Sequence, residues 1–567
     1  MKFDDIISYL GQFGPYQRRV YALICIPSIA IGMQTLASVF TMAVPDHRCE
    51  LSMWPGDTYD AQSTAHADAI RSSIPPGDDE EMWSSCSVKL WNGNPVFNST
   101  ATSGVFFEVN KTNVESNMTE ECSNWVYDKS IYKSTLISKL DLVCKNKLGR
   151  SHVQMFFMLG SLLGTLLLGP PADYFGRRKI MVVTIVLHLA ASIAIAFTPN
   201  FAFLCFFSML NGGSMSALYV VLFVIGMEFV GPKKRVYAGY IITMFFAVGV
   251  ILLVIAAYFI RNWQHLQFAI TSISIIFVAY YWLVPESPRW LFNKGRYSEA
   301  EVILRKAAEV NKKELPAKMF RWDEIEADGP AHEPMWHILK YPRLVVRTLV
   351  IYFNWMVCSM VYYGISLNVA DLAGNIYFNM LLYGVVELVS YLLCLVFLDR
   401  VGRRRLHLFC MFVSGIGCTV SPFPVLYLGS AFNWLNIMLA VLGKAGVSAA
   451  FATIWLYTSE LFPTVVRNAG VSSSSLSAKI GGVIAPYIAN LGLTVGGHVG
   501  DILPLLIFGI ASLVAGGLSL LLPETSDASL PDTLKDADRF GLRKSEGQPN
   551  NPEEMAELRL VDSELKT

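Results

Sequence analysis

Three charged side chains stand near the middle of long apolar stretches, where charge is rare. They are Glu387 in YGVVELVSYLL, Lys444 in VLGKAGVSAAF and Lys479 in SSSSLSAKIGG. On insertion scales such a charge costs about 2.5–3.5 kcal/mol, so we expect each to face a partner or a wet cavity. Glu387 can neutralise one lysine, which leaves one positive charge for a carboxylate-bearing ligand. The alternative is a buried ion pair or triad that only fixes helix packing.

A stripe of aromatic side chains offers a complementary surface. In YFNWMVCSMVYYGISLN, Trp355 and Tyr362 stand seven residues apart and so share a helix face, with Tyr363 adjacent. An aromatic ring attracts an ammonium group by about 0.5–2 kcal/mol. The stripe therefore predicts the wall of a cation site, although such stripes also arise from packing alone. Weaker candidates of the same kind are Phe245, Phe246 and Trp455.

A second set of charges recurs at the ends of apolar stretches, in DYFGRRK, EFVGPKKR, DRVGRRR and ELFPTVVR. An acid followed by basic residues at a helix end can pair in one conformation and separate in another, which is a switch. The predicted switch residues are Asp173, Arg177, Arg178, Asp399, Arg403 and Arg404, with Glu228, Arg235, Glu460 and Arg467 as their partners. The alternative is that the basic residues only set membrane orientation, which leaves the recurring acids unexplained.

Other chemistry is not indicated. The sequence has no recognisable pairing of nucleophile and base, no phosphate-binding glycine loop and no cluster of metal ligands. Its 45 basic and 45 acidic residues balance, so no nucleic acid partner is indicated. We expect no enzyme, no cofactor and no bound metal.

The composition is that of a membrane protein. Of the 567 residues 53% are hydrophobic and only 16% are charged, and the mean hydropathy is +0.42. Runs of about 18 apolar residues are long enough to cross a bilayer. We predict an all-α membrane protein with twelve spans at 20–45, 151–171, 180–198, 202–228, 236–260, 265–284, 345–367, 375–398, 405–428, 432–458, 468–493 and 501–522.

Repeated motifs divide these spans into two parallel halves of six. Three pairs of acids recur in the same order, 226 to 238 residues apart: Asp173 with Asp399, Glu228 with Glu460, and Glu286 with Glu524. The predicted segments are an N-terminus (1–19), span one (20–45), a long loop (46–150), spans two to six (151–284), a linker (285–344), spans seven to twelve (345–522) and a tail (523–567) that we expect to be disordered.

The long loop reads as extracellular. It carries four cysteines, Cys49, Cys86, Cys122 and Cys144, and three glycosylation acceptors, Asn98, Asn110 and Asn117. The four cysteines allow three disulfide pairings, which the sequence does not separate. The short loops after spans two, four and eight are rich in Lys and Arg, which places them and both termini in the cytoplasm. In the linker, Ser298 and Glu301 predict a capping box that starts an amphipathic helix.

These motifs resemble a known family. DYFGRRK and DRVGRRR in two parallel halves are similar to the major facilitator superfamily. The long loop, PESPRWL, SELFPTVVRN, LGQFGPYQRR, PDHRC and LLLPET resemble its solute carrier family 22 branch of organic cation, anion and carnitine transporters, over residues 1–525. The resemblance implies alternating access, a cytoplasmic latch formed by the switch residues, and a plasma-membrane location. It also implies that the aromatic stripe lines the substrate site. Lys479 occupies a slot where cation transporters of this branch carry aspartate and anion and carnitine members carry arginine.

The expected function is polyspecific transport of small organic ions across the plasma membrane. The favoured substrate is a zwitterion of the carnitine, betaine or β-amino acid kind, with its carboxylate near Lys479 and its amine against Trp355, Tyr362 and Glu387. Alternatives are an organic anion or an organic cation. Further alternatives are a sugar porter, disfavoured because 345–367 contains no glutamine, and a ligand sensor that does not transport. Coupling to a co-transported ion and the oligomeric state stay open.

Overall fold

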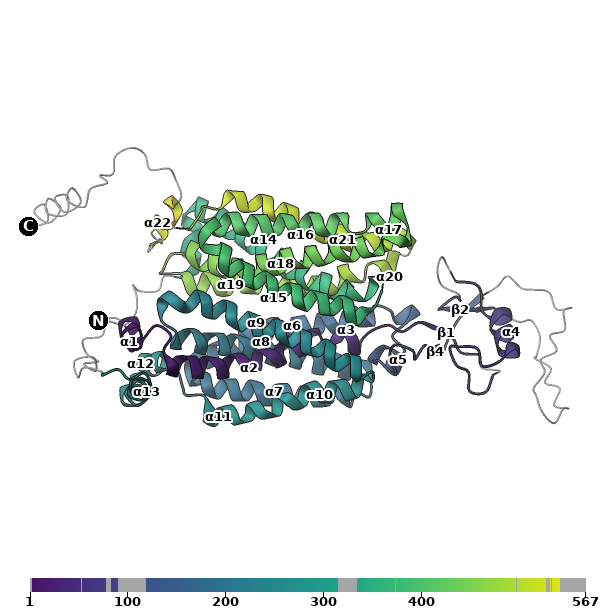
Figure 1. Cartoon of the computed structure of the whole chain (residues 1–567), viewed down its shortest axis with the longest axis horizontal. Helices are drawn as coiled ribbons and strands as arrows, with labels where there is room; N and C mark the ends of the chain where they lie inside the picture. The colour runs from purple at the N-terminus through teal and green to yellow at the C-terminus, as the bar shows by residue number, and fades with distance from the viewer. Residues whose placement is uncertain are drawn as a thin grey trace, which may run out of the picture.

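The chain folds into a bundle of long helices that run roughly along one direction, with four short strands at one end (Figure 1). The computed structural model describes residues 3–51, 54–77, 83–89, 119–314, 334–372, 374–495, 497–526, 531 and 533–540. Helices α1 (Phe3–Leu10) and α22 (Leu534–Arg539) lie at what we call the terminal end. The opposite end, which carries the strands, is called the loop end.

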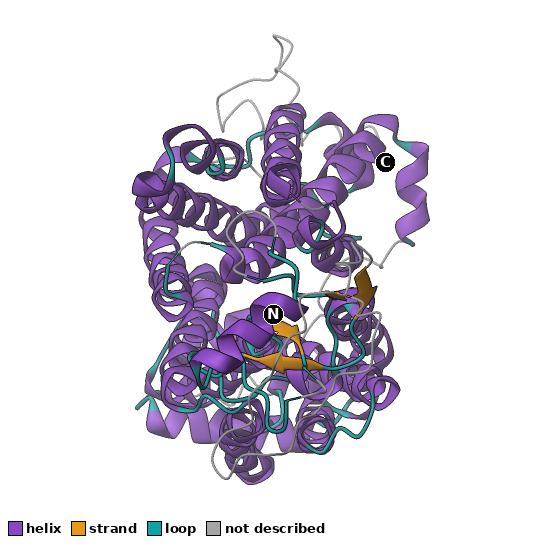
Figure 2. Ribbon diagram, turned by 90° about the vertical axis from the view of Figure 1, so that its right-hand side faces the viewer, coloured by secondary structure: helices purple, strands orange, loops and turns teal. Residues whose placement is uncertain are grey.

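The helices form two groups along the sequence. The N-terminal half contains α2 (Pro15–Leu36), α3 (Ser38–Thr41), α6 (Gly149–Phe175), α7 (Arg177–Ala196), α8 (Phe201–Phe229), α9 (Arg235–Phe259), α10 (Trp263–Ile275) and α11 (Tyr280–Leu283). The C-terminal half contains α14 (Pro342–Asn368), α15 (Ile376–Val401), α16 (Arg403–Val420), α17 (Phe423–Leu428), α18 (Asn433–Leu461), α19 (Arg467–Ala489), α20 (Gly492–Val495) and α21 (Gly497–Leu518). Figure 2 shows these helices end-on, with the strands in front of them.

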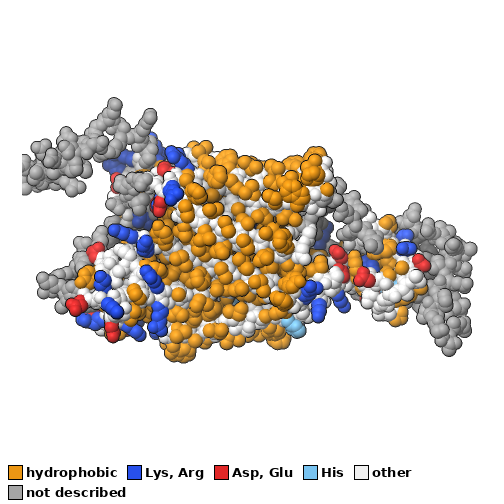
Figure 3. Space-filling view, in the orientation of Figure 1, with side chains coloured by type: hydrophobic (Ala, Val, Ile, Leu, Met, Phe, Trp, Pro, Cys, Tyr) orange, Lys and Arg blue, Asp and Glu red, His pale blue; other side chains and the backbone are white. Residues whose placement is uncertain are grey.

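Ten helical stretches among the described residues are long and apolar enough to cross a membrane. Two further helices, α16 and α19, coincide with predicted spans but are less apolar. The reason is that α16 begins with three arginines, whereas α19 carries four consecutive serines and Lys479. On the face that Figure 3 shows, apolar side chains form a broad band across the bundle, and charged side chains gather beyond it at both ends. This distribution is the one that a hydrocarbon layer requires of a spanning protein.

The two halves meet along α6 with α19 and α9 with α15 (Figure 1). Glycines make these contacts close. A Cβ on Gly384 of α15 would lie 2.8 Å from Ile251 of α9, and one on Gly482 of α19 would lie 3.2 Å from the Met158 sulfur of α6. Small residues at such crossings let helices approach where no water is available to drive association.

The terminal end holds the linker and the tail. The linker helices are α12 (Pro288–Asn293) and α13 (Tyr297–Val310). The predicted capping box is wrong, because α13 begins after Arg296 and Ser298 lies within its first turn without capping it. The predicted disorder of the tail is wrong for residues 533–540, where α22 packs against the C-terminal half. Its Ala537 and Phe540 carbonyls accept hydrogen bonds of 2.7 and 2.8 Å from Arg347.

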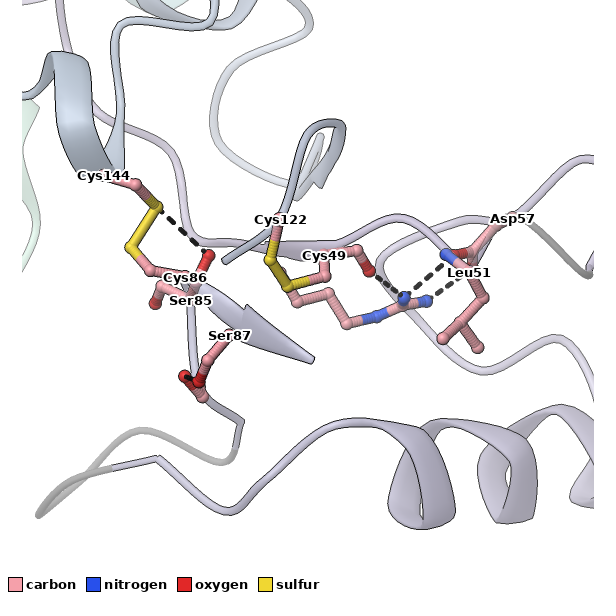
Figure 4. Close-up of a disulfide and its surroundings, with 10 residues drawn as sticks. Cys49, Leu51, Asp57, Ser85, Cys86, Ser87, Cys122 and Cys144 are labelled. Carbon is pink, nitrogen blue, oxygen red and sulfur yellow. Dashed lines mark hydrogen bonds and ion pairs between the residues drawn. A yellow bond between two sulfur atoms is a disulfide. The ribbon is translucent and has the colours of Figure 1, made fainter. Parts of the chain in front are cut away.

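The loop segment is a small disulfide-linked unit. It contains α4 (Thr64–Ser73), α5 (Leu136–Leu140) and two antiparallel strand pairs, β1 (His47–Cys49) with β4 (Trp125–Tyr127) and β2 (Ser87–Lys89) with β3 (Thr119–Glu121). Of the three possible pairings, the structure joins Cys49 to Cys122 and Cys86 to Cys144 (Figure 4). The predicted glycosylation acceptors Asn98, Asn110 and Asn117 lie outside the described residues.

A buried ion pair organises this unit. The Arg48 guanidinium donates hydrogen bonds of 2.9 and 2.5 Å to the Asp57 carboxylate, and the Leu51 amide donates to the same group at 2.8 Å (Figure 4). The His66 Nδ1 atom accepts from the Gln62 amide, so Nε2 carries the proton and donates to Asp57 at 2.9 Å. Burial alone would raise the pKa of Asp57, but the hydrogen bonds from Arg48 and Leu51 outweigh it and hold that pKa below its ordinary value.

The lowered pKa of Asp57 predicts how the loop responds to acid. A carboxyl group with a lowered folded pKa stabilises the fold above its unfolded pKa, about 4, and this contribution is lost as pH falls through the folded value. We expect cleavage of the loop by pepsin to increase steeply below about pH 4. The variant Asp57→Asn should already be cleaved rapidly at pH 5. Identical pH profiles for the two proteins would contradict the assignment.

Candidate functional site

A cavity of about 140 Å³ lies between the two halves. Its lining comes from α2, α6, α8 and α9 on one side and from α14, α15, α18 and α19 on the other. Most of the larger lining side chains are aromatic, and the cavity also includes Ser161, Ser216 and Ser475. The aromatic and basic lining residues are Phe157, Tyr219, Phe246, Tyr362, Tyr363, Tyr391, Phe451, Trp455 and Lys479.

Lys479 faces this cavity from α19. It forms no hydrogen bond and no ion pair with any residue in the described part of the chain. The local sequence explains how a lysine reaches this place. Ser474, Ala478 and Gly481 are buried, and a Cβ on Gly481 would lie 2.0 Å from the Met356 carbonyl oxygen of α14. Helix α19 is thus held tightly against α14, and the Lys479 side chain extends into the open space.

The other two predicted charges pair with each other. The Lys444 ammonium of α18 lies 3.4 Å from the Glu387 carboxylate of α15, and both side chains are fully buried. Tyr362 donates hydrogen bonds to both carboxylate oxygens at 2.9 and 3.1 Å, and Tyr391 donates to one at 2.8 Å. This network neutralises one lysine and satisfies Glu387, as a buried charge pair must be satisfied.

Lys444 is further fixed by two neutral groups. Its ammonium donates to the Ser366 hydroxyl at 2.8 Å and lies 3.3 Å from the centre of the Tyr362 ring. One face of Tyr362 is therefore already occupied by a cation within the protein. The site as a whole carries one surplus positive charge, and that charge belongs to Lys479.

The structure divides the predicted aromatic residues into two sets. Tyr362, Tyr363, Phe246 and Trp455 line the cavity, whereas Trp355 does not. Trp355 is fully buried, donates its indole N–H to the Thr458 hydroxyl at 2.8 Å, and packs edge-on against Trp455.

Position on a shared helix face does not decide access to the cavity, because neighbouring helices cover part of that face. Phe245 faces away and packs in the core of the N-terminal half. Sequence reasoning missed four aromatic lining residues: Phe157, Tyr219, Phe451 and Tyr391. Of these only Tyr391 had a signal, because it stands one helical turn after Glu387.

The switch residues form equivalent clusters in the two halves. In the N-terminal half, Arg177 contacts Glu228 at 2.9 Å and Asp173 at 3.2 Å. In the C-terminal half, Arg403 contacts Glu460 at 3.2 Å and Asp399 at 3.3 Å. These ion pairs stay within one half. The remaining switch arginines make local contacts: Arg178 lies over the Tyr281 ring, Arg404 donates to the Leu522 carbonyl, Arg235 to that of Met227 and Arg467 to that of Phe462.

One further acid completes each cluster, and sequence reasoning assigned it no role. Glu286 accepts hydrogen bonds from the Arg177 and Arg178 amides at the start of α7. Glu524 does the same for the Arg403 and Arg404 amides at the start of α16. A carboxylate at a helix N-terminus satisfies free amides and the helix dipole. The recurrence of Glu286 and Glu524 at matching places in the two halves was the available signal.

Another cavity adjoins the first on the side of the terminal end. A second cavity of about 240 Å³ shares Tyr219, Thr243 and Trp455 with the first and reaches Met227 and Arg235 at that end. At the loop end the halves touch instead. Phe40 stacks on Tyr377 with ring centres 5.5 Å apart, and the His152 ring nitrogen and the Tyr487 hydroxyl are 2.8 Å apart.

The buried pair predicts a non-additive loss of stability. Lys444→Met leaves Glu387 without its counter-charge, which costs about 3–5 kcal/mol for a buried pair. The double variant Lys444→Met/Glu387→Gln removes both charges and should recover most of the Tm of the solubilised protein. If the double variant is as unstable as the sum of the single variants, the two charges are not coupled.

The turn before α7 predicts a second effect. Gly176 has φ of 111°, and a Cβ there would lie 2.6 Å from the Glu286 carboxylate. Gly176→Ala should lower the Tm more than Gly295→Ala, because Gly295 also has positive φ, 72°, but has open space around it. Equal losses of Tm in the two variants would mean that the contact between residue 176 and Glu286 does not affect stability.

Comparison with known proteins agrees with this architecture. A family model described as sugar (and other) transporter matches residues 96–532. An organic cation transporter protein of Drosophila melanogaster is 37% identical over 98% of this chain and 97% of its own length. The human organic cation/carnitine transporter 2 is 31% identical, covering 94% and 93%. Mouse solute carrier family 22 member 3 is 33% identical, covering 95% and 96%.

Solved structures support the same fold. The xylose transporter XylE from E. coli, in a partially occluded inward open conformation, aligns with a TM-score of 0.56 and 17% identity over 68% of this chain and 90% of that one. The relatives are transporters, and the prediction of a transporter rather than an enzyme is confirmed. The chain is therefore a multi-pass membrane transporter that belongs to the major facilitator superfamily and, within it, to solute carrier family 22.

Proposed function

We propose that this protein carries small zwitterions that bear a carboxylate and an ammonium group across the plasma membrane by alternating access. The observation that carries the proposal is the unpaired Lys479 ammonium in an aromatic cavity between the two halves. In transporters built from repeats, substrate binds between the repeats near the middle of the membrane.

The carboxylate end of the substrate is assigned to Lys479. A buried or half-buried cation without a partner is unfavourable, and a bound carboxylate removes that penalty through a charge-assisted hydrogen bond. Ser161, Ser216 and Ser475 line the same cavity and offer hydroxyl donors. Lysine provides a point charge rather than the two-pronged fork of arginine, so it accepts carboxylates in several orientations. Such tolerance suits a polyspecific carrier.

The ammonium end is assigned to the aromatic wall. Trp455, Tyr363 and Phe451 line the cavity and are not occupied by an internal cation. This assignment differs from the one the sequence suggested. Trp355 lies behind Trp455, Tyr362 is covered by Lys444, and Glu387 is saturated by its own network.

The charge clusters at the terminal end are proposed to latch the conformational change. In this structure a cavity of about 240 Å³ reaches the terminal end, and both arginines bind acids of their own half. Closure at that end would bring the two clusters together. The proposal further places the terminal end in the cytoplasm and the loop end outside.

The charge and the lining of the cavity distinguish the zwitterion from the other candidate substrates. The relatives' names refer to organic cations, and a pure cation would be repelled by Lys479 unless the aromatic wall dominates. An organic anion would use Lys479 without the aromatic wall. A sugar would need many hydrogen-bonding side chains, whereas most of the larger cavity residues are aromatic.

Carnitine and choline provide a matched test, because both carry a trimethylammonium and a hydroxyl group but only carnitine carries a carboxylate. Lys479→Ala should abolish carnitine uptake and spare or increase choline uptake, at unchanged surface expression. Lys479→Asp should favour choline further. If carnitine uptake by Lys479→Ala equals that of the wild type, Lys479 does not bind the carboxylate.

Two further measurements complete the test. Uptake of carnitine, choline and a simple organic anion, with and without a sodium gradient, ranks the substrate classes and reports ion coupling. Counterflow of labelled carnitine in proteoliposomes distinguishes a carrier from a sensor, because a sensor binds ligand without producing flux.

A further inference from the structure

Helix α6 begins with a buried cation that has no partner. Arg150 is 3% exposed and makes no hydrogen bond or ion pair with any described residue; its Nε and Nη2 atoms are completely buried. Two other basic side chains of the described chain, Arg48 and Lys444, are buried to a similar degree. Each of them is paired with a carboxylate, Asp57 and Glu387 respectively. Arg150 is the exception to the rule that buried charges are compensated.

A second unsatisfied group lies one turn further along the same face. Both amide atoms of Gln154 are buried without a partner, and the side chain is 5% exposed. Residues four apart on a helix are neighbours on its surface, so Arg150 lies one turn from Gln154 on the same face of α6. Gln154 lines a cavity of about 70 Å³ at the loop end, together with Gln34, Asn211 and Gln267.

This outer cavity adjoins the proposed substrate cavity, because both are lined by Thr35, Phe157, Met158 and Tyr363. It lies next to the place where the halves close. Ser151, the residue after Arg150, donates to the Pro486 carbonyl of α19 at 3.4 Å, and His152 contacts Tyr487. The positive charge of Arg150 also acts on Tyr132: burial raises the pKa of that hydroxyl, and the guanidinium opposes the rise. Tyr132 packs against Tyr377 in the loop-end closure.

We propose that Arg150 and Gln154 form a second binding site, for a small anion, at the loop end of the path that leads to Lys479. The occupant has the chemistry of a carboxylate or a halide. It is either the carboxylate of the transported molecule, held before it reaches Lys479, or a free inorganic anion such as chloride. Because Ser151 and His152 on the same turn contact α19, occupancy of this site acts on the closure between the halves. The carboxylate form of this proposal rests on the proposed function, whereas the inorganic form does not.

Thermal unfolding of the purified full chain tests the site without requiring transport. The protein is placed in a HEPES buffer that lacks other anions, and sodium acetate or sodium chloride is added at matched ionic strength. We expect the wild-type Tm to rise with added anion. Arg150→Met removes the uncompensated charge, so its Tm should equal or exceed that of the wild type in HEPES alone. Its Tm response to added anion should be smaller than that of the wild type by the part that Arg150 contributes, and any remaining response belongs to Lys479.

The two sources give different results. A larger stabilisation by acetate identifies a carboxylate site, and a response to chloride alone identifies an inorganic anion site. Gln154→Leu should weaken the response at least severalfold, while Gln264→Leu, on α10 at the same end, should leave it unchanged. A wild-type Tm that responds to neither anion, or a response in Arg150→Met as large as that of the wild type, would overturn the proposal.

A failure of the Lys479 assignment remains distinguishable. Lys479→Ala should keep the Arg150-dependent part of the acetate response, measured as the difference between Lys479→Ala and Lys479→Ala/Arg150→Met. Loss of that difference would show that only one anion site exists. Its persistence would support two sites, whatever the carnitine uptake of the Lys479 variants proves to be.

Discussion

The cost of placing charge in an apolar bundle governs this structure. Within the membrane-spanning region, Glu387 is surrounded by Lys444, Tyr362 and Tyr391, so that every lone pair and the counter-charge are accounted for. At the terminal end, the same requirement produces the paired clusters around Arg177 and Arg403. Against this background of compensation, Lys479 and Arg150 are the two positions where the protein leaves a positive charge for something else to neutralise. Both lie along the interface between the halves, and both belong to helices, α19 and α6, that touch across it.

The duplicated architecture gives each half its own complete set of switch contacts. Glu286 and Glu524 hold the first turns of α7 and α16 from the ends of their respective halves, and Gly176 and Gly402 leave room for those carboxylates. In each half the switch arginine is therefore paired with acids of its own half. Motion of one half relative to the other does not require these clusters to be dismantled, which suits a rigid-body change.

The apolar runs and the recurring acids predicted long helices in two halves, and motifs such as DYFGRRK and PESPRWL carried the resemblance to the family. They also identified Glu387, Lys444 and Lys479, because charge in an apolar run is conspicuous. What they could not supply was the partner of each charge. That Glu387 takes Lys444 and leaves Lys479 depends on the rotation of three helices, and nothing in the spacing along one chain encodes that rotation. The same limit explains Trp355. The sequence placed it on the predicted helix face, but Trp455 lies between Trp355 and the cavity. Arg150 escaped notice because it stands at the end of a polar loop, where a charge needs no explanation until burial is known.

The loop unit is fastened to one half only. Cys86 is bonded to Cys144, five residues before α6 begins, and Ser134 pairs with Asn262 at the start of α10. The unit must consequently move together with the N-terminal half. Through Tyr132 it also presses on Tyr377 of the other half. The unit lies at the periphery of the molecule. A protein that binds it would favour one arrangement of the halves without contacting the substrate path.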